Sequence, residues 1–153
     1  MDRYSPTVRR DIGRIIDPLL AGLHAILGAA LVGFYLEGSL ALGEFDDASD
    51  IDFVAVTRAP VDEPLFDRLR TLHDELSRVD SRLALDLEGS YVSPEMLRHI
   101  RHDAVKVPNL ERGPGECLKW APLWASWIIH QSILRQAGIA LVGPPPADVI
   151  DPI

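Results

Sequence analysis

Asp50 and Asp52 are the side chains of this sequence best placed to do chemistry, because they stand two residues apart at the start of a predicted strand. That strand, 51–57, is rich in β-branched residues. Side chains alternate along a strand, so both carboxylates point to one face while Ile51 and Phe53 point to the other. Paired carboxylates repel each other unless divalent cations lie between them and a polyphosphate. The pair therefore predicts a two-metal site of the kind that Mg²⁺ occupies.

Gly38 and Ser39 form a second feature, at the end of the preceding predicted strand, 31–37. A glycine lets a phosphate approach the backbone, and the serine hydroxyl and nearby N–H groups can donate hydrogen bonds to it. Residues 38–49 are expected to form a loop or a short helix whose N-terminus would favour an anion. Ser49 is a further candidate for phosphate contact, with hydrogen bonding inside the turn as the alternative.

A third predicted strand, 83–92, carries two more acids, Asp86 and Glu88. They also stand two apart, so they would share one face of the strand. Either one could complete the metal site or accept the proton of an attacking hydroxyl. The residues alone leave both open.

The elements that must position these residues mix helix with strand. A helix over about 6–28 follows from the apolar periodicity, with either a kink at Pro18 or a second helix starting there. Asp62 is expected to cap another helix. The later elements are expected to be a short helix at 94–101, a mobile loop at 102–119, a helix from Pro122 to Gly138 and a strand at 139–142. This order predicts an α+β fold in two layers, with a small mixed β-sheet flanked by helices.

The length, the net charge and the cysteine content limit the number of domains, the possible partners and the location. The 153 residues fit one domain, expected at 1–146 and followed by a polar tail at 147–153 that does not pack. The net charge is −8, which makes nucleic acid a poor candidate partner. The single cysteine, Cys117, excludes an internal disulfide and fits a reducing compartment. No uninterrupted apolar run approaches ~18 residues, so we expect no membrane partner and a cytoplasmic location.

Two further groups of residues have structural interpretations. Trp120, Trp124 and Trp127 have the spacing of one helix face, which favours core packing. His130 and the other histidines show no metal-ligand spacing with Cys117, so we interpret them as ordinary helix or loop residues.

The motif Gly38-Ser39, then Gly43, then Ser49-Asp50-Ile51-Asp52 resembles the signature of polymerase-β-type nucleotidyltransferases. The segments 87–92 and 134–145 extend the likeness to the N-terminal domain of aminoglycoside adenylyltransferases of the streptomycin/spectinomycin type, over about residues 30–146. This resemblance points to Glu88 over Asp86 as the third acid.

The resemblance implies an enzyme that transfers a nucleoside monophosphate, AMP from ATP, to a hydroxyl and releases pyrophosphate. It implies that Asp50 and Asp52 bind two Mg²⁺ ions and that Glu88 is the base or a third metal ligand. Gly38, Ser39 and Ser49 would bind the nucleotide.

The sequence leaves open which kind of molecule accepts the nucleoside monophosphate. The resemblance favours a small molecule such as an aminoglycoside; the alternatives are a partner protein, as for one-domain antitoxin enzymes, or an inactive domain that binds a nucleotide or a partner. The resistance enzymes continue into a helical domain, whereas this sequence stops about ten residues after Gly143. We therefore expect a second copy or a partner chain to complete the cleft.

Overall fold

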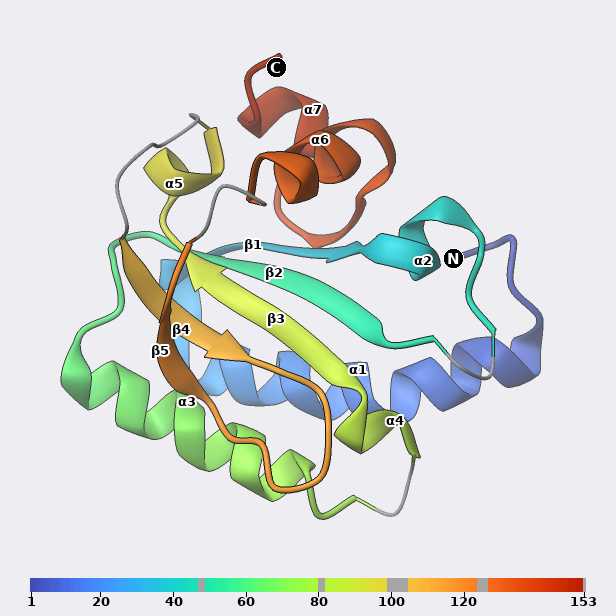
Figure 1. The fold of residues 1–153 in the computed structure, drawn as a ribbon, viewed down its shortest axis with the longest axis horizontal. Helices are drawn as coiled ribbons and strands as arrows, with labels where there is room; N and C mark the ends of the chain where they lie inside the picture. The colour runs from blue at the N-terminus through green and yellow to red at the C-terminus, as the bar shows by residue number, and fades with distance from the viewer. Residues whose placement is uncertain (47–48, 80–81, 99–104, 124–126, 153) are drawn as a thin grey trace.

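The computed structural model describes residues 1–153 except 47–48, 80–81, 99–104, 124–126 and 153. Six strands in the described residues form one open sheet in the order β5-β4-β3-β2-β1-β6 (Figure 1). Only β2 and β3 run parallel to each other among these pairs; the other neighbours are antiparallel. The strands are β1 (Leu31–Glu37), β2 (Ile51–Thr57), β3 (Leu87–Val92), β4 (Lys106–Leu110), β5 (Lys119–Pro122) and β6 (Ile139–Val142). The expected small mixed sheet is confirmed.

Helices cover both faces of this sheet (Figure 1). α1 and α3 lie along one face, and α5, α6 and α7 gather over the other. The described helices are α1 (Pro6–Leu27), α2 (Gly38–Leu42), α3 (Glu63–Leu76), α4 (Arg82–Leu85), α5 (Pro94–Arg98), α6 (Trp127–Ala137) and α7 (Pro146–Val149), with a 3₁₀ turn at Gly28–Ala30.

The two long helices both begin at side-chain caps, of which Asp62 is the one expected from the sequence. The Ser5 hydroxyl accepts a hydrogen bond from the Val8 N–H at the start of α1, and Asp62 accepts one from the Leu65 N–H at the start of α3. α1 continues through Pro18 as one helix, so the interpretation as two helices is wrong. Six apolar residues on one stripe of α1 are buried, namely Ile12, Ile15, Ile16, Leu19, Leu23 and Leu27.

Alternation along the central strands divides the core in two. Phe34 and Phe53 point to the face covered by α1 and α3, whereas Tyr35 and Val54 point to the face covered by α6. Ile150, just after α7, is 2% exposed and belongs to the second core. Part of the segment expected to be an unpacked tail therefore contacts the helices.

By length and composition alone, the stretch Pro6–Ala30 would be long and apolar enough to cross a membrane. This differs from the expectation, because the few charges that interrupt the apolar runs still leave a longer window with a high mean hydropathy. In the fold, its apolar stripe packs against the sheet, as a core helix does.

Two element predictions are wrong around the third strand. β3 begins at Leu87, because residues 82–85 form α4, so Asp86 lies at a bend before the strand rather than within it. The expected mobile loop at 102–119 contains β4, the start of β5 and a turn between them. Pro108 lies inside β4, beyond the pairing of Asn109 and Leu110 with β3, where its missing N–H is tolerated.

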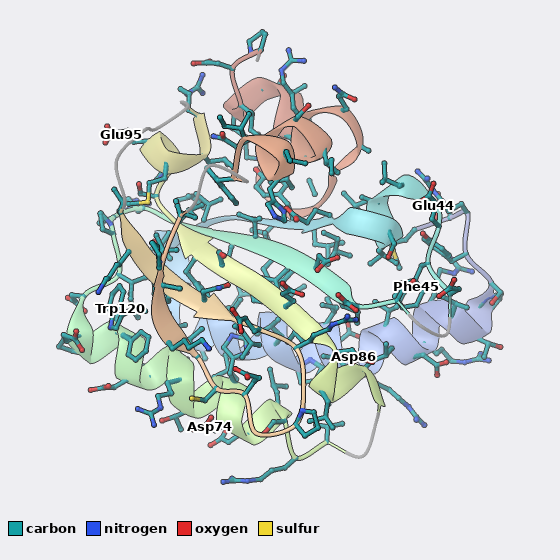
Figure 2. All side chains as sticks on the ribbon, viewed as in Figure 1. Glu44, Phe45, Asp74, Asp86, Glu95 and Trp120 are labelled. Carbon is teal, nitrogen blue, oxygen red and sulfur yellow. The ribbon has the colours of Figure 1, made fainter. Side chains whose placement is uncertain are left out.

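The last helix and the tryptophans also differ from expectation. Pro122 belongs to β5 rather than to the helix expected from Pro122 to Gly138, whose described part, α6, begins at Trp127. Trp120 therefore lies on a strand and stacks on Phe66 of α3, with ring centroids 4.9 Å apart (Figure 2). Trp127, the first residue of α6, is buried, and Trp124 lies outside the described residues. Trp120 and Trp127 do not share one helix face, since the first lies on a strand and the second on a helix.

Candidate active site

Three carboxylates meet at one end of the central strands. Asp50 immediately precedes β2, Asp52 is its second residue, and Glu88 is the second residue of β3. The parallel register pairs Asp52 with Glu88, which puts both side chains on one face. One carboxylate oxygen from each of the three lies within 4.8 Å of the others, the only such acidic group found among the described residues.

Gly38 lies directly against this group. Its φ is +63°, and a Cβ at this position would lie 2.2 Å from Asp52 Oδ2. Only glycine fits there, because an L side chain would meet both the backbone strain and the carboxylate. α2 starts at Gly38 and includes Ser39, and the Tyr4 hydroxyl donates a hydrogen bond to the Leu40 carbonyl of this helix. Of the two forms expected for residues 38–49, a loop or a short helix, residues 38–42 adopt the short helix beside the acids.

A fourth acid, Glu37, extends the row of carboxylates. It is the last residue of β1, pairs with Asp52 across the sheet, and is 4% exposed. His130 of α6, half exposed, donates a hydrogen bond from Nδ1 to Glu37 Oε1. The other oxygen, Oε2, is buried without a hydrogen-bond partner. Three neighbouring strands thus carry in-register acids at residues 37, 52 and 88.

Crowding raises the proton affinity of these acids. Burial, and then the negative charges of Glu88, Glu37 and Asp50, raise the pKa of Asp52 to about 7. Burial and the Asp50 charge raise the pKa of Glu88, while the nearby Arg112 opposes that rise. The hydrogen bond to Glu37 raises the pKa of His130. The site therefore holds negative charge at an energetic cost that a bound cation would relieve.

Arg112 contacts one of the three acids, Asp50, through its guanidinium. It follows β4, and its Nη1 donates to Asp50 Oδ1. The Arg112 side chain is 55% exposed, and that of Asp50 is 20% exposed.

A cavity of about 130 Å³ opens over the same strands. The lining includes acidic, polar and apolar residues. They are Glu37, Asp52, Phe53, Val54, Glu88, Gly89, Ser90, Asn109, Pro122, Leu123, Trp127 and His130. Typical small-molecule sites enclose ~300–1,000 Å³, so this cavity can enclose only part of a nucleotide.

The donor set fits a hard divalent cation. All the converging ligand atoms are carboxylate oxygens, which Mg²⁺ prefers over nitrogen or sulfur donors. The Oε2 atom of Glu37, which is buried without a hydrogen-bond partner, adds a further carboxylate oxygen beside these acids. Asp50, Asp52 and Glu88 are the residues that could hold such an ion.

The other predicted residues have different surroundings. Asp86 lies where α4 meets β3 and is not part of the acidic group (Figure 2). The Ser49 hydroxyl donates to Asp46 Oδ1 and accepts from the Asp46 N–H, at 3.1 and 3.0 Å. These bonds within the turn agree with the structural alternative for Ser49.

A family model described as a nucleotidyltransferase domain matches residues 26–101, the range that holds β1, α2, β2 and β3. This chain carries a nucleotidyltransferase domain of the polymerase-β type. Comparison with curated proteins gives no match.

Two solved structures resemble this nucleotidyltransferase. Spectinomycin adenyltransferase AAD(9) from Enterococcus faecialis, solved with ATP and spectinomycin, has a TM-score of 0.69 and 16% identity and is matched over 90% of this chain. This chain spans 59% of the length of that enzyme. A toxin-antitoxin structure with AMP-PNP has a TM-score of 0.45 and 17% identity, over 86% of this chain and 76% of its own. The first likeness confirms the expected fold and the resemblance to aminoglycoside adenylyltransferases.

Three residues at the site were missed from the sequence: Glu37, His130 and Arg112. Glu37 offered a signal, since a charged residue at the end of an apolar strand, next to Gly38, is unusual in a core position. His130 and Arg112 offered none, because only the folded sheet brings them to the acids.

Proposed function

We propose that this nucleotidyltransferase moves a nucleoside monophosphate, AMP from ATP, onto a hydroxyl of a small molecule such as an aminoglycoside. Pyrophosphate leaves. The observation that carries the proposal is the convergence of Asp50, Asp52 and Glu88 beside Gly38, inside a nucleotidyltransferase fold.

Asp50 and Asp52 would hold two Mg²⁺ ions in this proposal. Bound Mg²⁺ would neutralise the phosphate charge and orient the α-phosphate for in-line attack. The N–H groups of α2 and the Ser39 hydroxyl would hold the triphosphate, and Ser49 would support the turn that carries Asp50. Glu88 would take the proton of the acceptor hydroxyl, a task helped by the burial that raises its pKa.

The acceptor would enter over the cavity that the carboxylates line. Its acidic floor suits a positively charged, hydroxyl-bearing molecule, and the ring of Trp127 supplies an apolar wall. Because the cavity measures about 130 Å³, we propose that a second copy or a partner chain covers the rest of the ligands. We place the enzyme in the cytoplasm, where ATP is abundant and the free Cys117 stays reduced.

Label transfer tests this proposal. The chain is incubated with α-labelled ATP and Mg²⁺, and with aminoglycosides, the chain itself or a cell lysate as acceptors. Asp52→Asn and Glu88→Gln should lose transfer by about a hundred-fold or more, since each removes a group that acts on the reacting atoms. Asp86→Asn is the matched control, because it neutralises an acid of the same segment outside the acidic group.

The outcomes separate the candidates. Label on an aminoglycoside supports the proposal, whereas label only on a protein of the lysate would move the acceptor to the protein class. Binding of ATP with no transfer to any acceptor would contradict enzymatic activity of the chain by itself. Loss of transfer in Asp86→Asn but not in Glu88→Gln would assign the third acid to Asp86.

A further inference from the structure

Arg112 contacts Asp50, one of the three acids that could hold a metal ion. Its guanidinium donates to Asp50 Oδ1, and its charge also acts on Glu88. A divalent cation at Asp50 would take up the negative charge that attracts the guanidinium, and the two cations would repel each other. Metal binding at Asp50 therefore weakens the Arg112 contact and favours release of the guanidinium.

The Arg112 side chain can move without its backbone. It is 55% exposed, so little packing holds it. The next residue is fixed, because the Gly113 N–H donates to the Leu85 carbonyl at 2.7 Å. A displaced Arg112 would swing about a fixed backbone point next to the acids.

The proposed triphosphate cradle has no cationic side chain of its own, and the guanidinium of Arg3 lies at the end away from the acids, beside Gly43. The segment from Gly38 to Gly43 contains glycine, serine, leucine and alanine only. Arginine binds phosphate oxygens through two parallel hydrogen bonds, which makes it the side chain of choice for polyphosphates. Arg112 has the charge and the position for this contact once Asp50 has exchanged it for a metal ion.

We propose that Arg112 is a phosphate-binding residue that exchanges partners: it pairs with Asp50 in the metal-free protein and moves to the nucleotide phosphates when metal binds Asp50. This inference rests on the proposed function. It makes metal and nucleotide bind cooperatively, since the metal releases the cation that the nucleotide uses.

The exchange predicts opposite effects of one substitution on two ligands. Arg112→Gln removes the competitor at Asp50, so Mn²⁺ alone should bind about two- to five-fold tighter, the range expected for a half-exposed ion pair. The same variant should bind an ATP analogue with a methylene bridge between its α and β phosphates, in Mg²⁺, about ten-fold weaker or more. Arg112→Lys should keep the competition but recover only part of the analogue affinity, because lysine lacks the planar fork.

Titration calorimetry on the full chain measures both affinities. Lys119→Gln is the matched control, because it removes a cation from the same hairpin whose partners are Glu111 and Glu116 rather than the acidic group. It should leave both affinities unchanged. Weaker or unchanged Mn²⁺ binding in Arg112→Gln would overturn the inference, as would unchanged affinity for the analogue. Wild-type protein that binds neither ligand would overturn the proposed function as well, so the two failures are distinguishable.

Discussion

Gly38, which has no side chain, determines the shape of the site together with the carboxylates. At Gly38, the positive φ and the 2.2 Å approach to Asp52 Oδ2 leave no room for a Cβ. The backbone at the start of α2 can therefore lie against the acid. The same closeness would let phosphate oxygens reach the backbone and the metal-binding carboxylates together.

Gly38→Ala should therefore damage the site more than the fold. The methyl group would push the Asp52 carboxylate away, and a displacement of about 1 Å can reduce a rate about a hundred-fold. The strained backbone should cost about 1–3 kcal/mol of unfolding free energy. Gly28→Ala is the control, because it has a similar φ of +54° with nothing within 4 Å of the added Cβ. Urea unfolding and label transfer measure the two effects; equal transfer by both variants would contradict the steric argument.

At the scale of single residues, the sequence predicts which site residues lie together when they are close in the chain. Asp50 and Asp52 share a strand, so their spacing alone puts them on one face. Glu88 needed the resemblance to be chosen over Asp86, because the sequence does not mark where β3 begins. Glu37 and Arg112 join the group through sheet pairing and hairpin closure, which residue spacing does not encode.

At the scale of elements, α6 connects the C-terminal part of the chain to the acidic row. His130 of α6 donates to Glu37 at the end of β1, and Trp127 and Gln131 of the same helix each donate to the Met96 carbonyl. Glu37 is nearly inaccessible, so without His130 it would be a buried carboxylate with no hydrogen bond in the described residues. The pair holds the helix over the cavity.

His130→Ala should loosen α6 and destabilise the fold by about 1–3 kcal/mol, the cost of leaving a buried acceptor unpaired. Glu37→Gln combined with His130→Ala should recover part of this loss, because a neutral amide tolerates burial better than a carboxylate. Denaturant midpoints of the two single variants and the double variant form a double-mutant cycle. Additive losses in the double variant would mean that the two side chains do not act as a pair.

The predicted bounds of helices and strands agree with the structure where the sequence carries a clear periodicity or a capping residue. β1, β2, β6 and the capped starts of α1 and α3 agree with periodicity and caps. β4 was missed because Pro108 and the glycines after it indicate a loop, whereas pairing with β3 and β5 overrides that signal. The start of β3 was misplaced because leucines at 83, 85 and 87 alternate as in a strand, although the first two lie in a helical turn.

At the scale of the molecule, the sheet aligns three acids in a way that lowers the stability of the fold. Pairing of β1 with β2 and of β2 with β3 aligns Glu37, Asp52 and Glu88 side by side. Like charges in adjacent strands repel, and partial burial weakens their hydration. The sheet therefore holds a site that is complementary to cations and unfavourable without them.

Asp52→Asn should accordingly stabilise the metal-free protein while it abolishes transfer. The pKa of Asp52 is about 7 in the fold against an ordinary value of 3.8. Between these values the folded chain holds a proton that the unfolded chain has lost, so wild-type stability falls as pH rises through this window. Above it, Asn should gain about 2 kcal/mol, a figure reduced for solvent screening of a partly exposed group. Below about pH 4 the gain should vanish.

Denaturant unfolding of both proteins in EDTA, at about pH 4 and about pH 8, measures this gain. Added Mg²⁺ should then narrow the difference at the higher pH, because the ion stabilises only the chain that keeps the carboxylate. Asp86→Asn is the matched control, since it neutralises an acid just before β3, outside the acidic group. A gain in Asp52→Asn that is equal at both pH values would show that the aligned carboxylates do not set this cost.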